Sequence, residues 1–175
     1  MDLEQVHRWL DEARSGDEEA FACFLRWAYP SVFRLIFQIV PNTHDVEEIL
    51  QDAFFRFYRS LKRVRAGEDP MPYMRAIAIR RAYSFLKRRR LDTMSLEEIP
   101  EGVAEVSVAG HSEDLRRIYL WADGLPPKRR LVFLLREVLG VEDAEIARLM
   151  GIGEVTVRRH ASLAREMLEG AHGGR

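Results

Sequence analysis

The residues DAEIARLMGIGEVTVRRHAS, at positions 143–162, decide the fold of the C-terminal part of this chain. A helix-turn-helix needs a small residue where its two helices cross, a glycine in the tight turn and an apolar residue that anchors the second helix. Ala147, Gly151 and Val157 occupy these three places. The pattern therefore predicts two short helices that meet at a glycine turn.

The second helix of this motif, expected over 154–169, is predicted to leave a polar face outward. The outward residues are Glu154, Thr156, Arg158, Arg159, Ser162 and Arg165. Adjacent arginines near the N-terminal half of such a helix can reach base edges or phosphates in a major groove. An ordinary helical hairpin with a solvated arginine face would carry the same residues, and we favour DNA binding over that interpretation.

The other structured segments of the chain also have helical spacing. Helices are expected over 3–14, 18–39, 44–61, 71–90, 113–122, 126–139 and 143–150. No run alternates at period two for long enough to form a strand, so the predicted fold class is all-α. Pro30 should kink or split the helix over 18–39. The pair Pro126-Pro127 should begin the helix over 126–139.

A stretch of different composition divides the chain. Residues 91–112 contain Pro100, two glycines and only acidic charge. We interpret them as an acidic linker that joins two small helical domains. The expected organisation is an N-terminal domain, a linker, a C-terminal domain with the helix-turn-helix and a flexible tail, over 1–90, 91–112, 113–170 and 171–175.

The net charge of −1 conceals a strong segregation of charge along the chain. Residues 56–90 carry 12 Lys or Arg against two acidic residues, whereas residues 91–114 carry seven acidic residues and no basic one. The basic block indicates a polyanionic partner, because contacts between cations and phosphates release counterions. A solvated helix face is the alternative interpretation.

Composition excludes several classes of protein. A chain of 175 residues with 47% hydrophobic and 31% charged residues is neither disordered nor collagen-like. The single cysteine, Cys23, excludes a disulfide-stapled module. We find no run of about 18 apolar residues and no signal-peptide pattern. We therefore expect a cytoplasmic protein without direct membrane insertion.

Two helices of the N-terminal part carry candidate binding surfaces. The helix over 71–90 interleaves aromatic and basic residues, a combination that suits unpaired bases. Arg80, Tyr83, Ser84, Lys87 and Arg88 are placed outward by helical spacing, with Tyr73 near the start of the helix. The preceding helix has an outward stripe with one apolar residue among polar ones, which is a candidate protein-docking surface or a plain solvated face. Its members are Glu47, Glu48, Gln51, Asp52 and Phe55.

Nothing in the sequence favours catalysis. The five histidines are scattered, with no ligand spacing near Cys23 and no paired acids beside them. Glycine-rich phosphate loops and nucleophile elbows are absent from the sequence. We expect no enzyme activity, no catalytic residue, no metal site and no cofactor.

The order of these parts resembles the extracytoplasmic-function (ECF) sigma factors of the sigma-70 family. The resemblance is carried by GDEEAF (16–21), DVEEILQDAFFRFYRSL (45–61), the basic aromatic helix (73–90) and LPPKRRLVFLLREVLGVEDAEIARLMGIGEVTV (125–157). Members of that family are two-domain promoter-specificity subunits of bacterial RNA polymerase. The resemblance thus implies core RNA polymerase, promoter DNA and an anti-sigma factor as partners.

The resemblance also assigns a role to each predicted surface. It implies that Glu48, Gln51, Asp52 and Phe55 dock on the polymerase. The −10 element would be opened and read by the helix that carries Tyr73, Arg80, Tyr83, Ser84, Lys87 and Arg88. The −35 element would be read by the last helix, through Glu154, Thr156, Arg158, Arg159, Ser162 and Arg165. The linker would extend toward the active-site cleft of the polymerase.

Several positions depart from the family pattern. Arg80 and Ser84 stand where Asn and Asp are usual, and Gly153-Glu154 replaces a common Ser-containing start of the recognition helix. His160 and Leu163 replace residues that are usually basic. The DNA sequences preferred by better-known members therefore do not transfer to this chain.

The main alternative is a helix-turn-helix transcriptional regulator whose N-terminal helices form a sensor or a dimerisation domain. That alternative leaves the basic block, the stripe on 44–61 and the acidic linker without a role. A regulator should bind duplex DNA alone, whereas a sigma factor should confer promoter-specific initiation on core polymerase.

Overall fold

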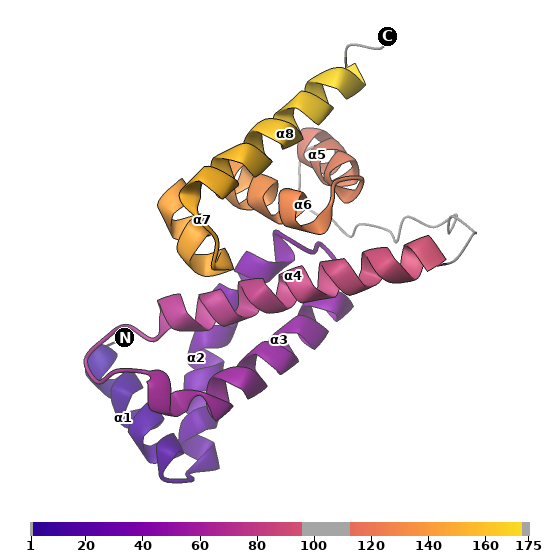
Figure 1. Ribbon diagram of the computed structural model, residues 1–175. Coiled ribbons are helices and arrows are strands. Elements are labelled where there is room, and N and C mark those ends of the chain that lie inside the picture. The colour runs from indigo at the N-terminus through magenta and orange to yellow at the C-terminus, as the bar shows by residue number, and fades with distance from the viewer. Residues whose placement is uncertain (1, 96–112, 173–175) are drawn as a thin grey trace.

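The computed structural model describes residues 2–95 and 113–172, and these ranges are built from helices without any strand (Figure 1). The N-terminal unit contains α1 (Leu3–Arg14), α2 (Glu18–Phe37), α3 (Thr43–Arg59) and α4 (Met71–Ser95), with a 3₁₀ turn, η1 (Leu61–Arg63), after α3. The C-terminal unit contains α5 (Glu113–Asp123), α6 (Pro127–Phe133), α7 (Asp143–Met150) and α8 (Glu154–His172), with a π-helical turn, η2 (Leu134–Val138), after α6. The all-α prediction is confirmed.

Short polar side chains and one glycine fix the helix ends. The carboxylate of Asp17 accepts a hydrogen bond from the amide of Ala20 and begins α2. Asn42 does the same for α3 through the amide of Asp45. Gly151 ends α7 with φ of 67°, a left-handed conformation that glycine adopts without steric cost. This turn sets the angle between the two helices of the motif.

The cores of both units are apolar and tightly closed. In the N-terminal unit the rings of Phe24 on α2 and Phe57 on α3 stack with centroids 4.9 Å apart, and both are fully buried. In the C-terminal unit Ala147 and Val157 are buried where α7 and α8 meet, as the helix-turn-helix pattern predicts. These cores hold α3, α4 and α8 in fixed positions, and those three helices carry the predicted surfaces.

Some element boundaries differ from those predicted. Pro30 lies within α2, which continues through it as one helix. The segment expected as one helix over 126–139 begins at the proline pair but changes to the π-helical turn after Phe133. Leu131 to Leu135 are all buried, and the wider turn rotates the following side chains relative to α-helical phase.

The ends of two further helices extend past their predicted limits. α4 continues to Ser95, into the stretch predicted as linker, and α8 continues to His172, into the stretch predicted as tail. The rest of the predicted linker, 96–112, and the end of the tail, 173–175, lie outside the described residues.

α2 is long and apolar enough, by length and composition alone, to cross a membrane, with a mean hydropathy of 1.2. The sequence prediction concerned an unbroken run of about 18 apolar residues, and α2 contains none because Arg26 and Arg34 interrupt it. Within the fold, Phe24, Ala28, Val32 and Ile36 form a buried face of α2 that packs against the other helices of the N-terminal unit. A core helix of a soluble protein passes the same test.

The two units are in direct contact. α4 packs against α6 and α7, which lie across it in Figure 1. The hydroxyl of Tyr119 on α5 donates to the carbonyl of Gln38 at 2.8 Å, and the guanidinium of Arg130 on α6 donates to the carbonyl of Ile39 at 3.4 Å. Both acceptors come directly after the last residue of α2, where main-chain carbonyls lack partners within the helix.

Candidate nucleic-acid and protein interfaces

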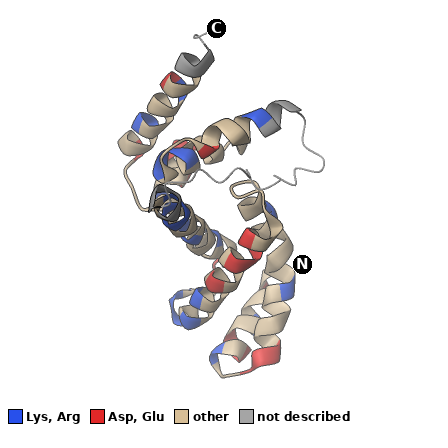
Figure 2. Cartoon of the chain, turned by 90° about the vertical axis from the view of Figure 1, so that its right-hand side faces the viewer, with Lys and Arg blue, Asp and Glu red and all other residues tan. Residues whose placement is uncertain are grey.

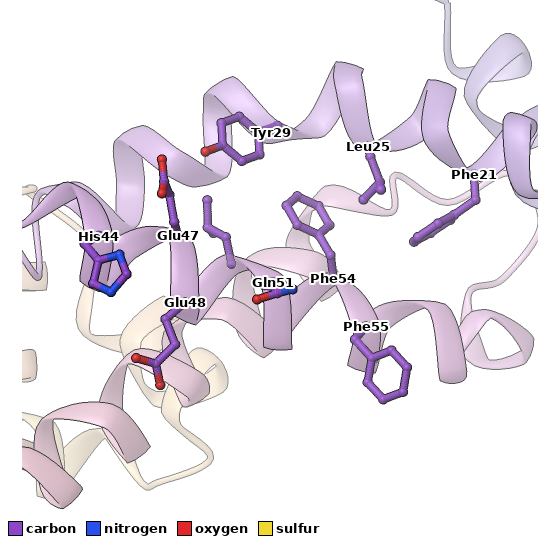
Figure 3. Close-up of a pocket in the computed structure, with 10 residues that line it drawn as sticks. Phe21, Leu25, Tyr29, His44, Glu47, Glu48, Gln51, Phe54 and Phe55 are labelled. Carbon is purple, nitrogen blue, oxygen red and sulfur yellow. The ribbon is translucent and has the colours of Figure 1, made fainter.

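A groove of about 660 Å³ runs between α2 and α3 (Figure 3). Its apolar part comes from both helices, and polar residues of α3 form one side. The lining residues are Phe21, Leu25, Tyr29, His44, Glu47, Glu48, Leu50, Gln51, Phe54 and Phe55. Phe55 is 59% exposed, a large fraction for an aromatic side chain on a helix of a folded domain. An apolar groove with an acidic side suits a partner helix with apolar and basic residues.

Three of the four predicted docking residues, Glu48, Gln51 and Phe55, are exposed and line this groove. Asp52 is not part of it. The Asp52 carboxylate instead faces α4, where it lies 2.5 Å from Nε of Arg81, and it also pairs with Arg56 at 2.9 Å. Helical spacing placed Asp52 on the outward stripe, but α4 covers that side of α3.

Two further acidic residues of α3, Glu48 of the stripe and Asp45 beside it, also pair with α4. Glu48 pairs with Arg88 at 2.6 Å and Asp45 pairs with Arg89 at 3.2 Å. Figure 2 shows this juxtaposition, with red residues of α3 beside the blue end of α4. The opposite charges of the two helices therefore partly neutralise each other within the N-terminal unit.

The predicted DNA-binding residues of α4 have unequal environments. Lys87 and Arg88 are exposed, and Arg88 lies over the Phe85 ring at 5.5 Å. Tyr73, Tyr83 and Ser84 are half-buried, which corrects the expectation that Tyr83 and Ser84 point fully outward. Packing causes the difference, because α4 contacts α3 on one side and the C-terminal unit on the other.

Arg80 and Tyr83 lie against the turn of the helix-turn-helix. Nε of Arg80 donates to the carbonyl of Leu149 at 3.2 Å, in the last turn of α7. A small cavity of about 170 Å³ separates the two units here, and it is lined by residues of α4, α6 and the turn. They are Ile79, Arg80, Tyr83, Lys128, Leu131, Met150, Gly151 and Ile152. In this arrangement part of the predicted α4 surface is occupied by the C-terminal unit.

The six predicted residues of α8 all lie exposed on one side of the helix, opposite its buried Val157, Ala161 and Ala164. Two of the arginines have carboxylate partners. Arg158 lies 3.5 Å from Glu154, and Arg165 lies 2.7 Å from Glu137 of η2. Sequence reasoning missed Val155, which is 73% exposed on the same helix. Val155 could have been found from the sequence, because it is an apolar residue at a helical position outside the predicted buried face.

Two titratable groups of the C-terminal unit have shifted pKa values. Burial lowers the pKa of His160, and the nearby cations Lys128, Arg129 and Arg159 lower it further. Burial also lowers the pKa of Arg130, and the adjacent Asp123 carboxylate opposes that shift. Neither residue was predicted to be functional: His160 is half-buried on α8, and Arg130 is buried where α6 meets the end of α2.

Within the described residues, no group of three or more His, Cys, Asp or Glu side chains is placed to hold a metal ion. The candidate surfaces are an apolar groove with an acidic side, a basic face on α4 and a polar face on α8.

Two family models match the chain. The model described as "Sigma-70 region 2" matches residues 24–91, and the model described as "Sigma-70, region 4" matches residues 115–168. The first covers most of the groove and most of α4, and the second covers the helix-turn-helix.

Curated relatives match over most of their length. The "ECF RNA polymerase sigma-E factor" of Escherichia coli (strain K12) is 28% identical over 173 residues, covering 91% of this chain and 90% of the relative. The "RNA polymerase sigma-E factor" of Streptomyces coelicolor is 25% identical over 157 residues, covering 86% and 85%.

Two solved structures share the fold. The sigma factor RpoE, in complex with the anti-sigma factor NepR from Bartonella quintana, has a TM-score of 0.63 at 18% identity and covers 88% of this chain and 97% of its own. CnrH, in complex with the cytosolic domain of CnrY, has a TM-score of 0.59 at 16% identity and covers 97% of both chains.

Proposed function

Because the chain belongs to the ECF group of the sigma-70 family, we propose that it binds bacterial core RNA polymerase and directs promoter-specific transcription initiation. The main support is that the region 2 model matches the N-terminal helical unit and the region 4 model matches the C-terminal one. In this proposal the N-terminal domain spans 1–90, the linker 91–112 and the helix-turn-helix domain 113–170. The protein acts in the cytoplasm by binding and remodelling, without a catalytic residue.

We assign polymerase docking to the groove between α2 and α3. Phe55 offers an exposed apolar anchor, and Glu48 and Gln51 flank it. Aromatic anchors surrounded by polar residues are typical of the centres of protein interfaces. Asp52 contributes indirectly, because its pairs with Arg56 and Arg81 tie α3 to α4.

In this proposal α4 opens and reads the −10 element. The contacting residues are Tyr73, Arg80, Tyr83, Ser84, Lys87 and Arg88. Aromatic and basic side chains on one helix can stack on separated bases and contact their phosphates. Arg80 and Tyr83 also contact the C-terminal unit, so opening of that contact would free more of the α4 surface for DNA.

In this proposal the exposed face of α8 reads the −35 element. Arg158 and Arg159 have the planar fork that binds guanine edges, and Glu154 can accept from a cytosine amino group. Thr156 and Ser162 add hydroxyls to the same face. Arg165, held by Glu137, lies farther along the helix and is better placed for phosphate.

An anti-sigma factor completes the proposed partners. Its support is that one solved neighbour is a sigma factor bound to an anti-sigma factor, with the same fold as this chain.

Run-off transcription with purified core polymerase on a library of promoter fragments tests the proposal. We expect the chain to direct core polymerase to a specific subset of promoters that core alone does not use. Electrophoretic mobility shifts with duplex DNA form the second arm. Tight sequence-specific binding by the chain alone, without any stimulated transcription, would identify a helix-turn-helix regulator instead.

A further inference from the structure

Val155 is the most exposed of the large apolar side chains that the structure describes, at 73%. It lies in the first turn of α8, which begins at Glu154. A β-branched residue slightly lowers the stability of a helix, and this one buries little surface in return. Val155 therefore contributes little to the fold, and its side chain is available to a partner.

Helical geometry directs Val155 away from the core of the C-terminal unit. Successive residues are about 100° apart around the helix axis, so Val155 lies on the side opposite Val157 and Ala161. Both of those residues are fully buried. Arg159, four residues after Val155, is exposed on the same side as Val155. Figure 1 shows α8 along the outer edge of the unit, where this side can be reached from outside.

The surroundings of Val155 are polar and include an unpaired cation. Its exposed neighbours on α8 are Glu154, Thr156, Arg158 and Arg159. Arg158 pairs with Glu154 at 3.5 Å, but no carboxylate of the described residues lies within ion-pair distance of Arg159. A free guanidinium one helical turn from the valine favours an anionic partner.

A protein partner would call for a larger apolar surface. Among the described residues of α8, the other exposed large apolar side chain is Met167, about 18 Å farther along the helix axis. Val155 is thus a single apolar group among polar ones, whereas the centres of protein interfaces are apolar patches. The major groove of DNA presents the matching surface. It places hydrogen-bonding base edges beside the C5 methyl group of thymine, which apolar side chains contact.

We propose that Val155 contacts the C5 methyl group of a thymine in the −35 element and thereby makes the protein prefer thymine at that position. This inference rests on the proposed function and adds an apolar contact to the polar ones already assigned to α8. The N-terminal residues of a recognition helix are the ones that meet base edges in the major groove.

The position of this thymine follows from the spacing of two side chains. Val155 and Arg159 are about 6 Å apart along the helix axis, and successive base pairs are about 3.4 Å apart. The thymine should therefore lie within about two base pairs of the position at which Arg159→Ala changes the base preference.

The test removes single methyl groups from the DNA. The full-length protein bound to core polymerase is titrated with promoter duplexes that carry the −35 element selected by run-off transcription. In each duplex one thymine of that element is replaced by deoxyuridine, which keeps the hydrogen-bonding edges of thymine and lacks only the methyl group. We expect the parent to lose about fourfold in affinity at one thymine, the effect of one buried methyl group.

Three variants of α8 assign the effect to a residue. Val155→Ala removes the contacting methyl groups, and alanine is the residue best suited to an exposed helical position. This variant should bind the thymine and deoxyuridine duplexes equally well at that position. Met167→Ala removes the other exposed apolar side chain and should discriminate as the parent does. Thr156→Ser removes the neighbouring exposed methyl group, keeps the hydroxyl and should also discriminate as the parent does.

Three results would overturn the assignment of Val155: a selected −35 element without thymine, a parent that binds every deoxyuridine duplex as tightly as thymine, or a Val155→Ala variant that discriminates as the parent does. If that variant also binds core polymerase more weakly, Val155 belongs to a protein interface instead. If the parent directs no promoter-specific initiation, the proposed function itself is wrong. If the parent initiates and one of the three results is found, only the assignment of Val155 is wrong.

Discussion

At the scale of single residues, Gln51 gives a cleaner test of the proposed polymerase docking at the α2–α3 groove than Asp52 does. Gln51 is exposed and lines the groove, whereas Asp52 pairs with Arg56 and Arg81 and its reversal would also disturb α4. Gln51→Arg adds a cation to the acidic side of the groove. We expect it to weaken core polymerase binding about tenfold or more without unfolding the domain, because like-charge contacts at interfaces are costly.

Fluorescence anisotropy with labelled protein and core polymerase measures this effect. Glu12→Arg, an exposed reversal on α1 outside the groove, is the control. If Gln51→Arg binds the polymerase as tightly as the control does, docking uses another surface.

His160 should make the stability of the C-terminal unit depend on pH. Its pKa is lowered in the folded state by burial and by Lys128, Arg129 and Arg159, so the unfolded chain takes up the proton more readily. The contribution of neutral His160 is therefore fully present above the ordinary histidine pKa of about 6.5. It is lost as the pH falls through and below that value.

Urea unfolding at pH 7.5 and pH 5.5 tests this sign. The parent should lose more stability on acidification than His160→Gln, which cannot gain a proton. The other histidines titrate in both proteins, so the difference between the two losses isolates His160. Equal losses would mean that the surrounding cations do not oppose its protonation.

At the scale of elements, the proposed function gives the residues of α8 two roles, base recognition and phosphate contact. Arg158→Ala or Arg159→Ala should change the preferred −35 bases at one position at least, since a bidentate arginine–guanine pair contributes about 1–3 kcal/mol of discrimination. Arg165→Ala should lower activity on all promoters alike, because a phosphate contact carries no sequence information. Transcription from a randomised −35 library with each variant separates the two effects. Unchanged base preference in both Arg158 and Arg159 variants would place recognition outside α8.

The turn and the exposed face of the helix-turn-helix could be predicted closely from sequence. The exposed face of α4 could not, although the helix itself could. Ala147, Gly151 and Val157 act within one local motif, so their spacing alone fixed the turn and the outward face of α8. α4 packs on two sides, against α3 and against the C-terminal unit, and thus has no single apolar face. Periodicity placed Tyr83 outward because nothing local reveals a second packing partner.

The candidate surfaces of the N-terminal unit show the same limit. The exposed Phe55 and Gln51 followed from helical spacing. Helical spacing did not predict that Asp52 turns toward α4, or that Arg59 and Arg63 lie beside Tyr73. Both features depend on how α4 crosses α3. Sequence patterns describe one helix at a time, and these sites belong to pairs of helices.

At the scale of the whole molecule, the contact between the two units should be sensitive to one hydroxyl. Tyr119 is 2% exposed, and its hydroxyl donates to the carbonyl of Gln38. Tyr119→Phe leaves that carbonyl without this donor, at a cost of about 1 kcal/mol. We expect a larger mean separation of the units and a larger radius of gyration in small-angle scattering of the free protein.

Tyr58→Phe removes a hydroxyl from an exposed tyrosine of α3 and serves as the matched control. A radius of gyration that is the same in both variants would show that the hydrogen bond of Tyr119 is not needed to hold the units together. Far-ultraviolet circular dichroism confirms that the helices remain intact in each protein.

The acceptors of these contacts between the units are main-chain carbonyls, those of Gln38, Ile39 and Leu149, whereas the donors are the side chains of Tyr119, Arg130 and Arg80. Every amino acid supplies a carbonyl, so the accepting side imposes no residue identity of its own. Position 38, which is only half-buried, is therefore free to drift during evolution, while the donating positions must keep a hydroxyl or a guanidinium. A substitution at position 38 should thus leave the Tyr119 contact between the two units intact.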